Sequence, residues 1–216
     1  MAVLKNPNAI TRAEQKKLTR QKIIDATFAV IAKEGFSDVT MAKVAETAGL
    51  SRGIGNFHFQ SKEQLLLETL RSIQREFDVA WTSAVAQAGP SPVDQLRALV
   101  RSLLEPPIAN PDRLSVWFAY WGEMPSRAAY AEICAAPDRE WRAAIEKILH
   151  QIAADKFNSH GMSLQAIAYS LTALMTGCWL EYLLSPGSFN PQDAVHACFA
   201  FLASFFPDFK HLDETI

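Results

Sequence analysis

Residues 39–66, VTMAKVAETAGLSRGIGNFHFQSKEQLL, contain two short helical patterns joined by a turn. Val44 and Leu50 are apolar where the two helices would meet, and Gly49 can adopt the left-handed backbone that a sharp turn requires. Ser51 is a suitable N-cap for the second helix, whose first amide groups would then be free to face phosphates or base edges. This is the helix-turn-helix pattern, and we therefore predict that the stretch enters the major groove of double-stranded DNA.

The rest of the chain also has apolar residues at helical spacing, separated by Gly, Pro, Ser and Asn. We expect helices over 12–34, 40–47, 51–58, 61–87, 92–104, 111–124, 126–160 with a kink at Pro137, 163–184 and 191–206. No strand pattern is present, so the sequence predicts an all-α fold of about nine helices. A three-helix DNA-binding domain over 1–60 would precede a larger helical bundle over 61–216, which would bind an effector and form the dimer.

The charge distribution supports a polyanionic partner for the N-terminal third. The 216-residue chain has a net charge of −2, but residues 1–71 carry 11 Lys and Arg against 7 Asp and Glu, a net of +4, and the remainder carries −6. The segment TRAEQKKLTRQK adds basic residues just before the helix-turn-helix: Arg12, Lys16, Lys17, Arg20 and Lys22. Such a run is either a solvated helix face or a phosphate-binding or minor-groove arm.

Several other classes of protein are disfavoured. The five histidines lack metal-ligand spacing, and no Gly-rich phosphate loop or Ser/His/Asp order is present, so neither an enzyme nor a metal or cofactor is expected. The first 17 residues lack a signal-peptide core, and the apolar run 164–184 includes Gln165, Ser170 and Glu181, which favours a buried helix over a membrane span. We therefore expect a cytoplasmic protein with no membrane partner. The three cysteines are expected to be buried and reduced. A protein-interaction bundle without DNA binding is a remote alternative.

The segment TMAKVAETAGLSRGIGNFHFQSKEQL, from Thr40 to Leu65, resembles the TetR family of transcriptional regulators. The resemblance implies that Arg52, Gly53 and Ile54 face base edges, and that Thr40 contacts a phosphate. The full set of candidate DNA-binding residues is Thr40, Lys43, Ser51, Arg52, Gly53, Ile54, Asn56, Phe57, His58 and Lys62. Arg52 could contact a guanine or only a phosphate. The family usually has an aliphatic residue at position 55 and Tyr at position 56; here Gly55 should soften the reading helix, and Asn56 could bind an adenine edge, a phosphate or only water.

The second half of the chain has aromatic and acidic residues in close sequence proximity. The segments SVWFAYW, DREWR and GCWLEYLLSPGSF resemble the choline-responsive, BetI-type branch of the same family. Aromatic faces with a carboxylate suit a quaternary ammonium group through cation–π attraction. The candidate effector-binding residues are Trp117, Tyr120, Trp121, Asp138, Trp141, Trp179 and Tyr182. Alternatively, these side chains form part of the core, or a pocket for an unrelated apolar or aromatic effector.

A homodimer is expected through the last two helices, 163–184 and 191–206, as the family resemblance also implies. The first of them is apolar around most of its circumference and has small residues, namely Ala168, Thr172, Ala173, Thr176 and Gly177. The second would add Val195, Phe199, Leu202, Phe205 and Phe206. Glu181 is either in water at the helix edge or paired in a cavity. A twofold dimer would present two reading helices to a palindromic operator, and a repressor released by a small molecule is the expected function.

Overall fold

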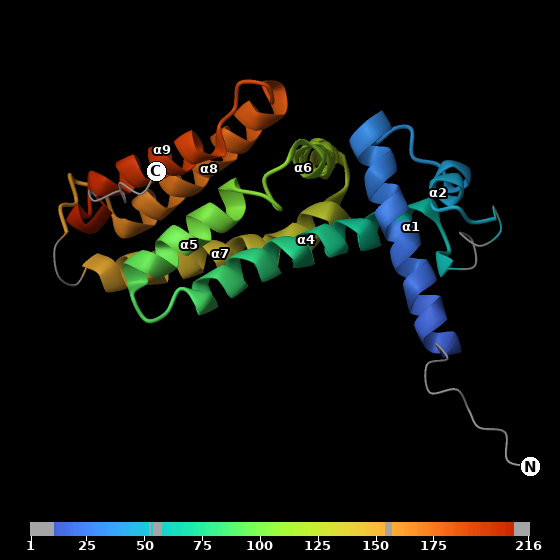
Figure 1. The fold of residues 1–216 in the computed structure, drawn as a ribbon, viewed down its shortest axis with the longest axis horizontal. Coiled ribbons are helices and arrows are strands. Elements are labelled where there is room, and N and C mark those ends of the chain that lie inside the picture. The colour runs from blue at the N-terminus through green and yellow to red at the C-terminus, as the bar shows by residue number, and fades with distance from the viewer. Residues whose placement is uncertain (1–10, 52, 54–57, 154–156, 210–216) are drawn as a thin grey trace, which may run out of the picture. The chain divides into compact units, whose positions relative to one another are not determined.

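The computed structural model describes residues 11–51, 53, 58–153 and 157–209. Within these ranges all regular structure is helical, which confirms the predicted all-α fold (Figure 1). The α-helices are α1 (Arg12–Glu34), α2 (Met41–Thr47), α4 (Lys62–Gln87), α5 (Pro92–Leu104), α6 (Pro111–Glu123), α7 (Ala128–Ala153), α8 (Leu164–Leu184) and α9 (Pro191–Ala203). Two 3₁₀ turns, Met124–Ser126 and Pro207–Phe209, follow α6 and α9. Most of the predicted helix 51–58 lies outside the described residues.

The helices begin and end close to the predicted positions because their ends carry capping residues. At the start of α1, the Thr11 Oγ1 accepts a hydrogen bond from the Glu14 N–H at 3.2 Å, and the Glu14 carboxylate accepts one from the Thr11 N–H at 2.7 Å. At its end, Gly35 has a φ of +93° and donates its N–H to the Ile31 carbonyl. The largest differences from prediction are that α7 ends at Ala153 and α9 at Ala203.

The chain divides into two compact units, Met1–Ser72 and Ile73–Ile216. Helix α4 contributes its first residues to the first unit and the rest to the second. The division of function that we predicted at residue 60 stays a prediction, because compactness alone does not assign a function to either part.

In the first unit, α1 packs against α2. The core side chains come from both helices, from the segments that flank α2 and from the start of α4: Ile23, Ile24, Ala26, Val30, Ile31, Val39, Val44, Ala45, Phe59, Leu65, Leu66 and Leu70. Residues 11–18, by contrast, are all exposed, so the first two turns of α1 add no side chain to this core.

In the second unit, α5 is the central helix and packs against α7, α8 and α9. Its fully buried side chains are Leu96, Leu99, Val100, Leu103 and Leu104. Helix α6 packs against α8, and α8 lies beside α9 (Figure 1). The helices that carry the aromatic residues therefore surround a common interior.

Within the single chain, helix α8 is buried along one face, and the predicted burial is confirmed for that face only. Its other face exposes Tyr169, Leu180 and Leu184, whose exposed fractions are 66%, 43% and 70%. The length and apolar composition of α8 would allow it to cross a membrane, but a helix from the core of a soluble protein meets the same criterion.

The apolar residues predicted to extend the dimer surface along the last helix are instead in the core of their own chain. Val195, Phe199, Leu202, Phe205 and Phe206 are all buried. The prediction was wrong because an apolar stripe shows that one side of a helix is covered, but not whether the same chain or a partner covers it.

Candidate functional site

The turn after α2 has the geometry that a helix-turn-helix requires. The Leu50 N–H donates to the Ala45 carbonyl at 2.9 Å, and the Gly49 N–H donates to the Glu46 carbonyl at 3.0 Å. These are the paired hydrogen bonds of a Schellman motif, which needs a left-handed residue, and Gly49 has a φ of +65°. A side chain at position 49 would strain this turn, so the glycine sets the direction in which the chain leaves α2.

The N-terminal end of α2 is capped and neutralised within the protein. The Thr40 Oγ1 accepts a hydrogen bond from the Lys43 N–H at 3.1 Å. The Lys43 Nζ lies 2.6 Å from the Glu34 carboxylate and 4.0 Å from that of Asp38. The hydrogen bond to Glu34 raises the pKa of Lys43. To contact DNA, the Lys43 ammonium would have to exchange these exposed acidic partners for a phosphate.

The other predicted DNA-binding residues are only partly within the described structure. Arg52, Ile54, Asn56 and Phe57 lie outside the described residues, while Ser51 and Gly53 are exposed and His58 is half-buried. Lys62 is half-buried in the first turn of α4, whose start is capped because the Ser61 Oγ accepts the Gln64 N–H at 3.1 Å. The roles of all these residues in DNA binding stay predictions.

The basic residues of α1 divide into two groups. The Arg20 guanidinium lies 3.1 Å from the Glu68 carboxylate and 4.8 Å from the centre of the Phe59 ring, so it holds α1 to the start of α4. Arg12, Lys16, Lys17 and Lys22 are exposed. Burial lowers the pKa of His58, and the nearby charges of Lys16 and Arg20 lower it further. His58 therefore stays neutral at neutral pH in positively charged surroundings.

The second unit contains a small cavity of about 100 Å³ surrounded by α4, α6, α7 and α8. Half of its lining residues are aromatic, and the other half contribute a carboxylate, an amide, a guanidinium and two hydroxyls. The lining residues are Gln74, Phe77, Trp117, Trp121, Asp138, Trp141, Arg142, Thr172, Thr176 and Trp179.

Phe77 organises the aromatic wall. Its ring lies edge-to-face with the indoles of Trp117, Trp141 and Trp179, at centroid distances of 6.1, 5.6 and 6.0 Å and interplanar angles of 77°, 84° and 82°. Trp121 extends the group through a tilted contact with Trp117 at 6.1 Å. These distances fall within the range of favourable aromatic pairs, so the rings fix one another in a box.

A hydrogen bond fixes the orientation of Trp179. The Trp179 Nε1 donates to the Leu103 carbonyl at 2.8 Å. Leu103 is in the last turn of α5, so its carbonyl has no partner within the helix, and Pro107, four residues further along the chain, has no N–H to offer. The indole therefore satisfies a carbonyl that the helix itself cannot, and the bond holds one wall of the cavity in place.

Two carboxylates lie at or beside the cavity. Burial raises the pKa of Asp138, while the nearby Arg142 guanidinium lowers it and the charge of Asp78 raises it. Burial also raises the pKa of Asp78, against the effect of a 3.1 Å hydrogen bond from the Gln74 Nε2. Burial and both carboxylates together raise the pKa of the Cys134 thiol to about 12. The surroundings of Asp138 thus favour a compensating positive charge.

Five of the seven predicted effector-binding residues line this cavity: Trp117, Trp121, Asp138, Trp141 and Trp179. Tyr120 and Tyr182 do not. Successive helical residues differ by about 100° in direction, so Tyr120 points well away from Trp121 and packs on Tyr130 at 5.4 Å. Tyr182 stacks on Phe189, in the connection between α8 and α9, at 4.3 Å. An effector role for any of the seven stays a prediction.

The other residues that line the cavity were not predicted from the sequence. Phe77 follows Leu66, Leu70 and Ile73 along the buried side of α4, so its spacing alone indicates only a core position. Gln74 gave a stronger signal, since it is a polar residue next to that stripe. Arg142 was also missed, and two further lining residues, Thr172 and Thr176, had been assigned to the dimer surface.

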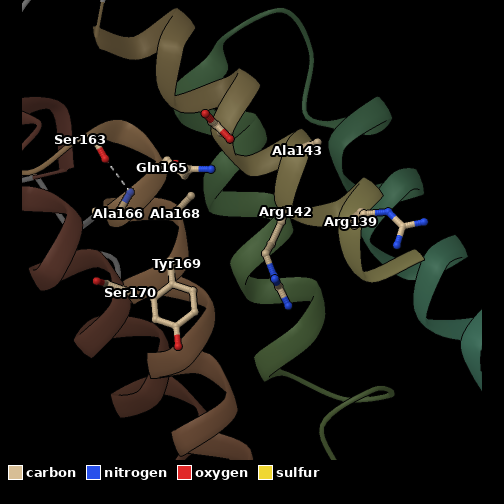
Figure 2. Close-up of a pocket in the computed structure, with 10 residues that line it drawn as sticks. Arg139, Arg142, Ala143, Ser163, Gln165, Ala166, Ala168, Tyr169 and Ser170 are labelled. Carbon is tan, nitrogen blue, oxygen red and sulfur yellow. Dashed lines mark hydrogen bonds between the residues drawn. The ribbon is translucent and has the colours of Figure 1, made fainter. Parts of the chain in front are cut away.

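Two open grooves lie along α8. One, of about 530 Å³, separates α7 from the start of α8; Arg142 and Tyr169 project into it, whereas Arg139 points away from α8 (Figure 2). The other, of about 480 Å³, runs beside Ala173, Gly177 and Glu181 toward the start of α9. Glu181 is exposed there, which resolves its two predicted placements in favour of the helix edge.

Comparisons with known proteins agree with both halves of this description. Residues 23–69 match the model for bacterial regulatory proteins of the tetR family. Residues 92–207 match the model for the C-terminal domain of BetI-type transcriptional repressors. The HTH-type transcriptional regulator BetI of Stenotrophomonas maltophilia is 31% identical over 183 residues, which cover 85% of this chain and 90% of the relative.

Solved structures share the fold. A crystal structure described as a transcriptional regulator from Pseudomonas aeruginosa PAO1 has a TM-score of 0.76 at 26% identity, covering 93% of this chain and 95% of that one. Another regulator, from Saccharomonospora viridis, was crystallised in complex with choline; its TM-score is 0.75 at 22% identity, covering 88% and 98% of the two chains.

The match to the C-terminal family model spans more than half of the chain, and it adjoins an N-terminal match that includes the helix-turn-helix. Both families, and the relatives that share them, are transcriptional regulators rather than enzymes. The chain belongs to the TetR family of DNA-binding transcriptional regulators, with a C-terminal domain of the BetI type.

Proposed function

We propose that this regulator is a cytoplasmic repressor that binds a palindromic operator as a homodimer and is released by a small quaternary ammonium compound such as choline. The observation that carries the proposal is the cavity that four tryptophans and Phe77 line together with Asp138. A group with four alkyl substituents on nitrogen has no N–H to donate, so aromatic faces and a carboxylate are the protein groups best suited to it.

The size of the cavity supports a small ligand. Its volume of about 100 Å³ is well below the roughly 300–1,000 Å³ of sites for drug-sized molecules. Each desolvated cation–π contact contributes about 2 kcal/mol, against about 0.5–1 kcal/mol when exposed. Three or four such contacts in a buried box are enough for useful affinity. The choline-bound Saccharomonospora viridis regulator is consistent with this ligand, although its 22% identity supports only the shared fold.

The exposed face of α8 supports the homodimer. Gln165, Tyr169, Ala173 and Gly177 follow one another at intervals of about one turn, Leu184 lies about two turns after Gly177, and all five are exposed. Large apolar and small residues in one stripe suit close packing against the same stripe of a second copy. On α9, the exposed stripe consists of His196, Ala197 and Ala200 and continues to Ser204 just after the helix; it would complete a twofold four-helix contact.

Helix α4 offers a route from ligand to DNA. It contributes Gln74 and Phe77 to the cavity and begins with Lys62 next to the helix-turn-helix. A ligand that fits the cavity better in one conformation of the dimer than in another would favour that conformation. The distance between the two helix-turn-helix domains would then change. The ligand must bind those conformations unequally, because equal binding shifts no equilibrium.

Calorimetric titration tests the cation. Choline should bind, and 3,3-dimethylbutan-1-ol, which has the same shape without the charge, should bind at least about tenfold more weakly through the loss of cation–π attraction. Equal affinities would mean that the cavity accommodates an apolar effector, which is the second reading of the aromatic wall. Electrophoretic mobility shift with the DNA upstream of the gene, compared with a scrambled duplex at the same salt concentration, tests operator binding.

A further inference from the structure

Gln74 is the one amide in the wall of the aromatic cavity. Its side chain is buried, with an exposed fraction of 4%. The Nε2 donates to the Asp78 Oδ1 at 3.1 Å, while the Oε1 accepts no hydrogen bond from any residue that the structure describes. Buried side-chain oxygens nearly always have a hydrogen-bond partner, so an acceptor left open beside a cavity points to a donor on whatever fills that cavity.

The orientation of the Gln74 amide follows from its neighbour. An ionised carboxylate can only accept hydrogen bonds, so Asp78 must face the NH₂ end of the amide. The carbonyl end is then the one without a partner among the described residues, on a side chain that lines the cavity. Helix α4 thus presents an acceptor, rather than a donor, to a bound ligand.

We propose that the Gln74 Oε1 accepts a hydrogen bond from a hydroxyl group of the effector, so that the site selects a quaternary ammonium alcohol over a hydroxyl-free ammonium and over an ammonium acid. This inference rests on the proposed function, since it assumes that the aromatic box holds the ammonium group. The proposed function assigns a site to the ammonium group of the ligand, and this inference assigns one to its hydroxyl group. The regulator would then respond to the alcohol, and not to the carboxylate made by oxidising it.

The remaining polar groups fit this assignment. Thr172 and Thr176 donate their hydroxyl protons to the Ala168 and Thr172 carbonyls at 2.9 and 3.0 Å, so they offer no free donor to a ligand carboxylate. Asp138 would repel such a carboxylate. The guanidinium of Arg142 could attract it, but Arg142 is exposed and its charge already acts on Asp138.

The test compares two cations that differ only in the donor. Dissociation constants of the full-length protein for choline and for propyltrimethylammonium, in which a methyl group replaces the hydroxyl, give a preference ratio. In the wild type the ratio should be about tenfold in favour of choline, the size expected when one hydrogen bond satisfies a buried acceptor. Gln74→Met, which keeps the length of the side chain and removes the amide, should bring the ratio close to one. Glycine betaine should bind the wild type more weakly than either cation.

Thr176→Val is the matched control, because it removes a different polar group from the same wall without loss of volume, and it should keep the wild-type ratio. A wild-type ratio near one overturns the inference even if Gln74→Met does not fold. So does a ratio that survives in Gln74→Met, or one that disappears in Thr176→Val. If both cations bind equally well, the proposed effector class stands and the role of Gln74 fails. If neither binds, both fail.

Discussion

Replacing Trp179 with Phe should destabilise the protein by removing one specific hydrogen bond. The indole Nε1 is the donor to the Leu103 carbonyl, and Pro107 cannot replace it. Leu103 is fully buried, so water is not a ready substitute. Leaving a buried acceptor without a partner costs about 1–3 kcal/mol, and the smaller ring adds a further loss of packing.

Trp121→Phe is the matched control for the loss of ring volume. Trp121 lines the same cavity but is half-buried, and its described contacts are with the rings of Trp117 and Phe118. Trp179→Phe should therefore lower the free energy of unfolding by about 1–3 kcal/mol more than Trp121→Phe does. For a chain of this length that difference corresponds to roughly 2–12 °C in melting temperature.

Chemical denaturation at one fixed protein concentration measures both variants, since dimerisation would make stability depend on concentration. The Trp179 variant should also bind choline more weakly, because the remaining ring is no longer held against the cavity. Equal losses of stability in the two variants would refute the reasoning, because the carbonyl of Leu103 would then have another partner or no need of one.

Further predictions concern DNA, the dimer and pH. Arg52→Ala should lower affinity for the operator by about 1–3 kcal/mol more than for a scrambled duplex, whereas Lys62→Ala should weaken both alike; equal losses for Arg52→Ala would remove its base contact. Gly177→Lys should give monomers without operator binding, because a Cβ added there meets nothing within 4 Å in a single chain and a charged side chain would be forced into the contact with a partner. Gly122→Lys is the control, since a Cβ at Gly122 also meets nothing within 4 Å, and a Gly177 variant that sediments as a dimer would exclude this face. The affinity for the cation should be highest at a pH where Asp138 is ionised, and it should fall as the pH drops through the raised pKa of Asp138. Asp138→Asn should remove this pH dependence when binding is measured by calorimetry. If the variant keeps the wild-type pH dependence, Asp138 is not the counter-charge.

The ends of the helices and the helix-turn-helix could be predicted from sequence because local rules decide them. The Thr11 capping box, the positive φ of Gly35 and the Schellman turn at Gly49 each depend on a few consecutive residues. Part of the aromatic cluster could be predicted for a similar reason. Trp117 and Trp121 are four residues apart, so one helix face carries both of them to the same cavity.

Contacts between distant segments could not be predicted in this way. The contact of Lys43 with Glu34 and the pairing of Trp179 with Leu103 join different helices, and helical periodicity does not specify them. The same limit explains Phe199, whose apolar spacing on α9 fits a dimer surface and the core equally well. Gln74 was missed because its chemical meaning depends on a cavity whose walls come from four helices.

The most direct test of the central claim is the affinity of the wild-type protein for its operator with and without saturating choline, at one salt concentration. We predict that choline raises the operator dissociation constant at least about tenfold, a coupling of about 1.4 kcal/mol, and that operator DNA weakens choline binding by the same factor. If choline binds in the cavity but leaves operator affinity unchanged, the cavity is not the switch that releases the regulator from DNA.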